Sequence, residues 1–123
     1  MASHNDFGHQ AEDLAVDFLI KKDYRILARN FRYQKAEIDI IAEFQNKIII
    51  VEVKARSTDV FNLPQEAVNK KKIKLLVMAT DYYLEENKIN KEVQFDIISV
   101  LMDANKHLVI THIENAFESF DSM

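Results

Sequence analysis

Three charged side chains lie in or at the end of two neighbouring apolar segments of the chain. Asp39 lies within residues 37–41, and Glu52 and Lys54 end the next apolar run. Both runs are rich in β-branched residues, which indicates strands, and the short polar segment 43–47 between them suits a hairpin turn. Side chains alternate between the faces of a strand, so Glu52 and Lys54 share one face. Two carboxylates and an ammonium group converging there could bind a divalent metal ion and act on a phosphate.

The same pattern has two other interpretations. A Glu-x-Lys triplet on a strand is also typical of a solvated sheet face, and Glu52 and Lys54 could form a structural ion pair. Residues 48–53 are almost continuously apolar, however, which is typical of a strand buried on both faces. Burying two charges on such a strand is unfavourable unless they are paired or bound to a metal. We therefore expect these charges to have a structural or chemical role.

Composition narrows the kind of metal site that the chain can form. Its 123 residues are enough for one domain with a single core. The absence of cysteine excludes disulfides and thiolate zinc sites. The four histidines, His4, His9, His107 and His112, lack the H-x-x-x-H spacing of zinc hydrolases. A metal would have to be held by carboxylates and carbonyls, which favours Mg²⁺ or Mn²⁺.

Charge is unevenly distributed along the chain. The net charge of −4 argues against tight non-specific binding to nucleic acid. Between Lys54 and Lys74, however, six basic side chains accompany two acidic ones, whereas from Asp81 onward nine acidic side chains accompany three basic ones. A polyanion is therefore expected to bind at the basic segment. With no apolar stretch of membrane-spanning length and no features of a signal peptide, we expect a cytoplasmic protein without membrane contact.

Apolar periodicity predicts an α/β domain with the order α-β-β-β-α-β-β. We expect an amphipathic helix over residues 5–22 and a second helix over 64–86, which Pro64 would begin. A short terminal helix is expected to include Ala116 and Phe117. Strands are expected at residues 24–32, 37–44, 47–56, 93–102 and 107–113. The second helix would connect two parallel strands, giving a central mixed sheet of about five strands flanked by helices.

Short motifs occur along nearly the whole chain. In the first half they are Gly8-x-x-Ala11-Glu12-x-x-Ala15, Asn30-x-Arg32, Glu37-Ile38-Asp39-Ile40-Ile41-Ala42 and Val51-Glu52-Val53-Lys54-x-Arg56. In the second half they are Glu66-Ala67-Val68 with Lys72, Phe95-Asp96-Ile97-Ile98 and His112-x-x-x-Ala116-Phe117. Together they resemble the YraN family of uncharacterised bacterial proteins. The chain departs from the family's pattern with Ala36 in place of Gly and Gln94 in place of Arg, and Gln94 removes one phosphate contact.

That family is similar to the PD-(D/E)xK, or restriction endonuclease-like, superfamily, and most of all to the archaeal Holliday-junction resolvases. The resemblance implies one endonuclease-like domain over residues 1–123 that hydrolyses phosphodiester bonds in DNA, branched or structured DNA in particular. Asp39, Glu52 and the backbone carbonyl of Val53 would bind Mg²⁺ or Mn²⁺. Lys54 would orient the attacking water or offset charge that develops on the phosphate. Glu12 would complete the catalytic set, as a glutamate of the first helix does in the resolvases.

Several neighbouring residues have alternative roles. Glu37, expected on one strand face with Asp39 and Ile41, is the nearest rival to Asp39 as a metal ligand. Arg56 follows Lys54 in alternation and is expected to bind the DNA backbone. The run Lys70, Lys71 and Lys72 would flank the site and contact phosphates, although three such lysines are also typical of a solvated helix face.

Two further features are expected to serve structure. Asp96 is expected to form a structural hydrogen bond within another strand. Tyr82 and Tyr83 are expected to pack in the core rather than stack on bases.

Two other functions are compatible with these residues. One is a catalytically silent nucleic-acid-binding module with a nuclease-like fold, and the other is a scaffold whose acidic C-terminal part binds a protein. The presence of Asp39, Glu52 and Lys54 together favours the nuclease. So short a chain would act on a two-fold symmetric DNA junction as a homodimer.

Overall fold

The computed structural model describes residues 4–57 and 68–122, and the order α-β-β-β-α-β-β is confirmed. The first helix and three strands are α1 (His4–Lys21), β1 (Arg25–Tyr33), β2 (Ala36–Phe44) and β3 (Lys47–Ser57). The second helix and the last elements are α2 (Lys70–Glu86), β4 (Val93–Met102), β5 (Leu108–Phe117) and the 3-10 turn η2 (Ser119–Ser122). All strand ends but the last coincide with the predicted ones or differ from them by one residue.

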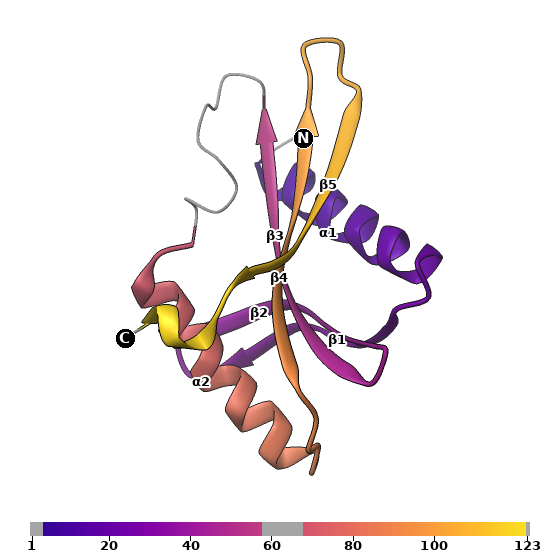
Figure 1. The fold of residues 1–123 in the computed structure, drawn as a ribbon. Helices are drawn as coiled ribbons and strands as arrows, with labels where there is room; N and C mark the ends of the chain where they lie inside the picture. The colour runs from indigo at the N-terminus through magenta and orange to yellow at the C-terminus, as the bar shows by residue number, and fades with distance from the viewer. Residues whose placement is uncertain (1–3, 58–67, 123) are drawn as a thin grey trace.

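The strands form one mixed, strongly twisted sheet with the order β1-β2-β3-β4-β5 (Figure 1). β1, β2 and β3 form an antiparallel meander, and Gln45 and Asn46 both have positive φ in the two-residue turn between β2 and β3. β3 and β4 are parallel because α2 lies in the connection between them, and β5 is antiparallel to β4. The predicted mixed sheet of five strands flanked by helices is therefore confirmed.

The two helices pack against opposite faces of the sheet, and β3 contributes to both cores. On the α1 face, Ala11, Ala15 and Leu19 pack with Ile49 and Val51. On the α2 face, the corresponding residues are Ile73, Leu76 and Ala79, with Ile48 and Ile50. These side chains are almost fully buried, and each large one contributes about 1.5–3 kcal/mol to folding. The prediction of a strand buried on both faces is confirmed.

The predicted start of the second helix is wrong within the described residues. Val68 and Asn69 are not helical, and α2 begins at Lys70, because the Asn69 side chain caps it by accepting a hydrogen bond from the backbone N–H of Lys72 at 2.9 Å. Pro64, the expected first residue, lies outside the described residues. Among the helices that the structure describes, none is both long and apolar enough to span a membrane.

The predicted terminal helix is also wrong at its two named residues. Ala116 and Phe117 belong to β5, which extends beyond the predicted end of its strand. Phe117 remains in the strand because its ring stacks on Phe95 of β4, with 5.1 Å between ring centroids, and packs into the α2-face core. Within the described residues, the short η2 turn follows β5.

Candidate active site

Glu52 and Lys54 project from β3 toward α2. Ile48 and Ile50 lie on this side, and regular alternation along β3 continues the series to Glu52 and Lys54. Glu52 is only 4% exposed, whereas Lys54 is half-buried. The predicted common face of these two side chains is confirmed, and the interpretation as a solvated face is excluded for Glu52.

Asp39 lies where β2 separates from β3. The paired residues run from Phe44 and Lys47 to Ile40 and Val51, and the register stops there although β2 continues to Ala36. Beyond the last pair, the backbone N–H of Val53 donates a hydrogen bond to Oδ2 of Asp39 at 2.8 Å. One side-chain bond thus joins the strands where their backbone ladder ends.

The separation interrupts the alternation of side chains along β2. Ile38 and Ile41, three residues apart, both pack in the α2-face core, whereas Ile40 packs in the α1-face core. Glu37 and Asp39 nevertheless line the same pocket as Glu52, beside α2, and Ile41 packs in the α2-face core. These placements agree with the prediction that Glu37, Asp39 and Ile41 share one face, although Ile38 breaks the regular alternation.

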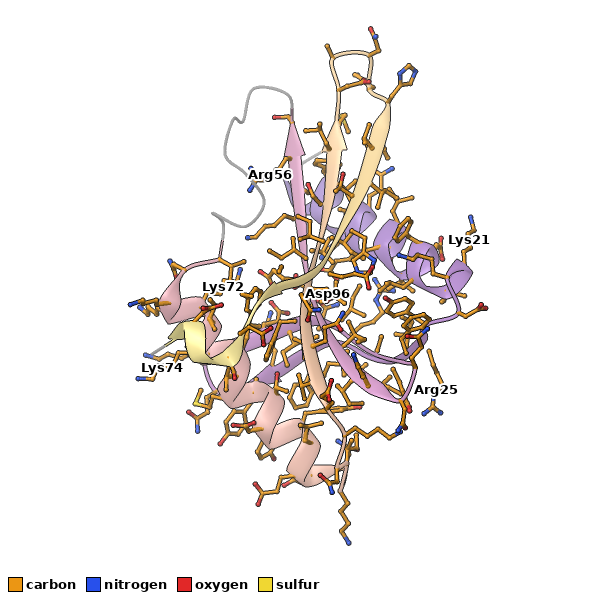
Figure 2. The ribbon with its side chains drawn as sticks, in the orientation of Figure 1. Lys21, Arg25, Arg56, Lys72, Lys74 and Asp96 are labelled. Atoms are coloured by element: carbon orange, nitrogen blue, oxygen red, sulfur yellow. The ribbon has the colours of Figure 1, made fainter. Side chains whose placement is uncertain are left out.

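The carboxylate of Glu52 is paired with two lysines. Its Oε2 atom forms an ion pair with Nζ of Lys72, from the first turn of α2, and lies 3.8 Å from Nζ of Lys54. Figure 2 shows Lys72 at the N-terminal end of α2. Glu52 and Lys54 therefore do not form an isolated structural ion pair, because Lys72 of α2 is the closer partner of Glu52.

The carboxylate of Asp39 is partly buried and lies near the carboxylates of Glu52 and Glu12. Burial raises the pKa of Asp39 to about 8, with a further contribution from the charge of Glu52 and a smaller one from Glu12, while the hydrogen bond from Val53 opposes the shift. With such a pKa, the Asp39 carboxyl group is mostly protonated at neutral pH in the metal-free protein.

The two lysines respond differently to the same surroundings. Burial lowers the pKa of Lys54, and the neighbouring charge of Lys72 lowers it further. Burial also acts to lower the pKa of Lys72, but its bond to Glu52 outweighs this and the net pKa is raised. Lys72 is therefore the more firmly protonated of the two.

Glu12 reaches this region from α1, on the other face of the sheet. Its side chain is 17% exposed, and Oε1 lies 3.9 Å from Nη2 of Arg29 on β1. Arg29 also forms an ion pair with Asp13 at 2.7 Å. The effect of Glu12 on the pKa of Asp39 places the two carboxylates in one electrostatic environment. Sequence reasoning missed Arg29, since nothing in its local sequence distinguishes it from other strand arginines.

A pocket of about 370 Å³ opens between β2, β3 and the first turns of α2, and its lining residues are Lys35, Ala36, Glu37, Asp39, Glu52, Asn69, Lys71, Lys72, Leu75 and Leu76. Of the predicted basic residues, Lys71 and Lys72 line it, whereas Lys54, Arg56 and Lys70 do not. Glu37 lines it as well, with its carboxylate 3.4 Å from Nη2 of Arg32.

Sequence reasoning missed Lys35 and Asn69 in this pocket. It also grouped Lys72 with its neighbours, although helical spacing places Lys72 on the same face as the buried Leu76 and Ala79. The helical spacing alone could have predicted that Lys72, unlike Lys70, faces the sheet.

The donor groups at this site fit a hard divalent cation. Within residues 4–57 and 68–122, no three acidic or histidine side chains form a ready-made cage for a metal. Mg²⁺ does not require one, because it retains several waters and is usually bound through one or two carboxylates. Asp39 and Glu52 supply two such carboxylates in one pocket.

Two other predicted features lie outside the site. Asp96 is fully buried and accepts hydrogen bonds from Gln94 and the backbone N–H of Asn115, in agreement with a structural role. Tyr83 packs edge-on against Phe31 as expected. Tyr82 is 38% exposed, and its ring stacks on that of Tyr33 of β1 with 4.0 Å between the ring centroids. The prediction of core packing is therefore wrong for this residue.

Comparison with known proteins gives a family match across most of the chain. Residues 11–100 match the uncharacterised protein family UPF0102, the YraN-like family that the motifs resemble. This range includes every predicted site residue from Glu12 to Lys72. A UPF0102 protein of Flavobacterium psychrophilum is 50% identical over 98% of this chain and 100% of its own length. Another, from Christiangramia forsetii, is 48% identical with the same coverage.

Among solved structures, SfsA of Pyrococcus furiosus in complex with Ca²⁺ is similar at a TM-score of 0.37 and 14% identity. The match covers 86% of this chain and 63% of the SfsA chain, so this chain spans less than two thirds of that protein's length.

Proposed function

This chain belongs to the uncharacterised protein family UPF0102, and we propose that it is a divalent-metal-dependent nuclease that hydrolyses phosphodiester bonds in DNA. The observation that carries the proposal is the pocket in which two carboxylates, Asp39 and Glu52, meet the ammonium groups of Lys71 and Lys72. Carboxylates suit a metal, and ammonium groups suit the phosphate that such a metal would bind. Branched or structured DNA is the proposed substrate class, and a homodimer would suit a two-fold symmetric junction.

Asp39 and Glu52, together with the backbone carbonyl of Val53, would hold Mg²⁺ or Mn²⁺. When bound, such an ion lowers the pKa of a water molecule and neutralises charge on the phosphate. The N–H of Val53 keeps Oδ2 of Asp39 directed at β3, beside the carboxylate of Glu52. Glu12 would orient water at the edge of the site from α1, where Arg29 restrains its carboxylate.

Lys54 is the residue proposed to act on the reacting groups. It lies 3.8 Å from Glu52 and is half-buried, so its ammonium group is held close to the carboxylates. Its lowered pKa makes a proton easier to release than from an ordinary lysine. Lys54 would orient the attacking water and offset the negative charge that develops on the phosphate.

Lys71 would bind phosphate at the mouth of the pocket. It is exposed, lines the pocket and lies in the first turn of α2, where the helix dipole also favours an anion. Arg56 and Lys70 would contact DNA only further from the reacting phosphate, because neither lines the pocket and, unlike Lys54, neither is paired with Glu52. DNA bound across the N-terminal end of α2 would therefore place a phosphate beside Asp39 and Glu52.

The direct test is cleavage of linear, flapped and four-way DNA by purified protein with Mg²⁺ or Mn²⁺. We expect the wild type to cut at least one of these substrates and Glu52→Gln to lose the activity by about 100-fold or more. Glu85→Gln removes an exposed carboxylate at the far end of α2 and is the matched control, expected to cut at the wild-type rate.

Two outcomes of this test would count against a nuclease. Equal cleavage by wild type and Glu52→Gln would identify a contaminating enzyme. DNA binding without cleavage on any substrate would instead favour a catalytically silent binding module. Asp39→Asn and Glu37→Gln in the same assay decide between the two rival acids, and we expect only Asp39→Asn to abolish cleavage.

A further inference from the structure

The carboxylate of Glu52, one of the two proposed metal ligands, is already paired with cations of its own chain. Both lysines approach the same oxygen, Oε2, with Lys72 in an ion pair and Lys54 at 3.8 Å. The Glu52 side chain is 5% exposed, so an ion from solvent can reach its carboxylate only if a neighbouring group moves aside. A divalent ion at Oε2 would lie within a few ångströms of the Lys72 ammonium group and would repel it.

Lys72 is better placed than Lys54 to move away. Lys54 projects from the centre of the sheet and does not line the pocket, whereas Lys72 lines it and is 35% exposed. The backbone of Lys72 is held by the Asn69 cap, so a displacement requires only rotation of its four-carbon side chain. Lys71, the preceding residue, lines the same pocket and is exposed, so this part of the pocket opens to solvent.

We infer that Lys72 is a built-in counter-ion of Glu52 that a divalent metal ion displaces, and that the displaced ammonium group then binds the phosphate beside the metal. The second half of this inference rests on the proposed nuclease function, whereas the first half concerns metal binding alone. Lys72 thereby has two opposing effects. It competes with the metal for Glu52, and it contributes to the reaction once the metal is bound.

The opposing effects give Lys72 a signature that a structural role would not produce. Replacing it should tighten metal binding and at the same time slow cleavage. A residue that only maintained the shape of the pocket would weaken both when replaced. A residue that only added positive charge near the pocket would change metal affinity no more than Lys71 does.

The experiment is calorimetric titration of metal-stripped, DNA-free protein with MnCl₂, using wild type, Lys72→Met, Lys72→Gln and Lys71→Met. Lys72→Met keeps the length of the side chain, and Lys72→Gln provides a polar variant if Met disturbs the fold; circular dichroism checks both. We expect the Lys72 variants to bind Mn²⁺ about tenfold more tightly than wild type, because a contacting charge is removed. Lys71→Met is the control for charge without contact and is expected to change affinity by less than about threefold.

The same variants are then assayed for DNA cleavage at saturating Mn²⁺, where we expect Lys72→Met to be at least about tenfold slower than wild type. Displacement is overturned if folded Lys72 variants bind Mn²⁺ no more tightly than Lys71→Met does, or if no variant binds Mn²⁺ at millimolar concentration. Full cleavage by Lys72→Met would overturn the phosphate contact alone. Absence of cleavage by the wild type would overturn the nuclease proposal, whereas tighter Mn²⁺ binding by the Lys72 variants would still support displacement.

Discussion

The backbone N–H of Val53 donates to the carboxylate of Asp39 at 2.8 Å, so β3 holds in place the acid that β2 supplies. The bond forms where the two strands stop pairing through their backbones. Asp39 therefore occupies a defined position next to Glu52 even though its own strand no longer pairs with β3 at this point.

Asp39→Asn should flatten the pH dependence of stability in metal-free protein. The pKa of Asp39 is raised from an ordinary value of 3.8 to about 8, so between these values the folded state binds more protons than the unfolded state. The free energy of unfolding should then fall as pH rises through this window, because the buried carboxyl group becomes charged beside Glu52. Urea unfolding of wild type and Asp39→Asn at pH 5.5, 7 and 8.5 measures the difference. The raised pKa would be contradicted if, as pH rises, the free energy of unfolding of the wild type does not fall relative to that of Asp39→Asn.

Lys71 and Lys70 should differ in their contribution to DNA binding, although they are adjacent. Lys71 lines the pocket and Lys70 does not. In a Glu52→Gln background, in which we expect no cleavage, Lys71→Ala should lower the slope of log affinity against log salt by about one, as expected for one lost phosphate contact. Lys70→Ala should leave that slope unchanged. Fluorescence anisotropy with a flapped DNA at several salt concentrations gives both slopes, and equal slopes for the two variants would assign DNA binding to another surface.

His112→Ala should destabilise the protein without affecting metal binding. Nε2 of His112 lies 2.7 Å from Oδ2 of Asp96, and the side chains are only 3% and 0% exposed. Removing one partner of such a buried pair costs about 3 kcal/mol. The exposed His107, whose Nδ1 lies 3.5 Å from Asp103, is the matched control, and His107→Ala should have little effect on the urea midpoint. A change in Mn²⁺ affinity for His112→Ala would mean that this pair also positions the site.

Asn69→Ala should weaken both the first turn of α2 and the site beside it. Oδ1 of Asn69 accepts the hydrogen bond that caps the helix, and loss of such a cap costs about 1 kcal/mol. Because Lys71 and Lys72 lie in this turn, we expect DNA binding to fall with stability. Asn69→Ser can form the same cap and should restore both. Thermal unfolding and anisotropy measurements on the two variants test this, and a stable Asn69→Ala protein would show that packing alone defines the start of the helix.

Elements that depend on local pattern could be predicted from sequence. The β-branched run at Ile48 indicated a strand buried on both faces, and alternation placed Glu52 and Lys54 on one side of it, as observed. Helix ends were less predictable. Pro64 suggested an early start for α2, but the side chain of Asn69 caps the helix later. Phe117 was expected in a helix and is held in β5 by the ring of Phe95 on another strand.

The sequence by itself determined the order of elements, the two-sided burial of β3 and the chemical types of the candidate site residues, because hydrophobic periodicity and side-chain chemistry are local properties. Only the tertiary structure decided which charges meet. Glu52 pairs with Lys72 twenty positions away, Asp39 bonds to the backbone of Val53, and Glu12 approaches Arg29. Each contact depends on how far two strands stay paired and on the rotation of a helix over the sheet. Packing of the whole chain sets both.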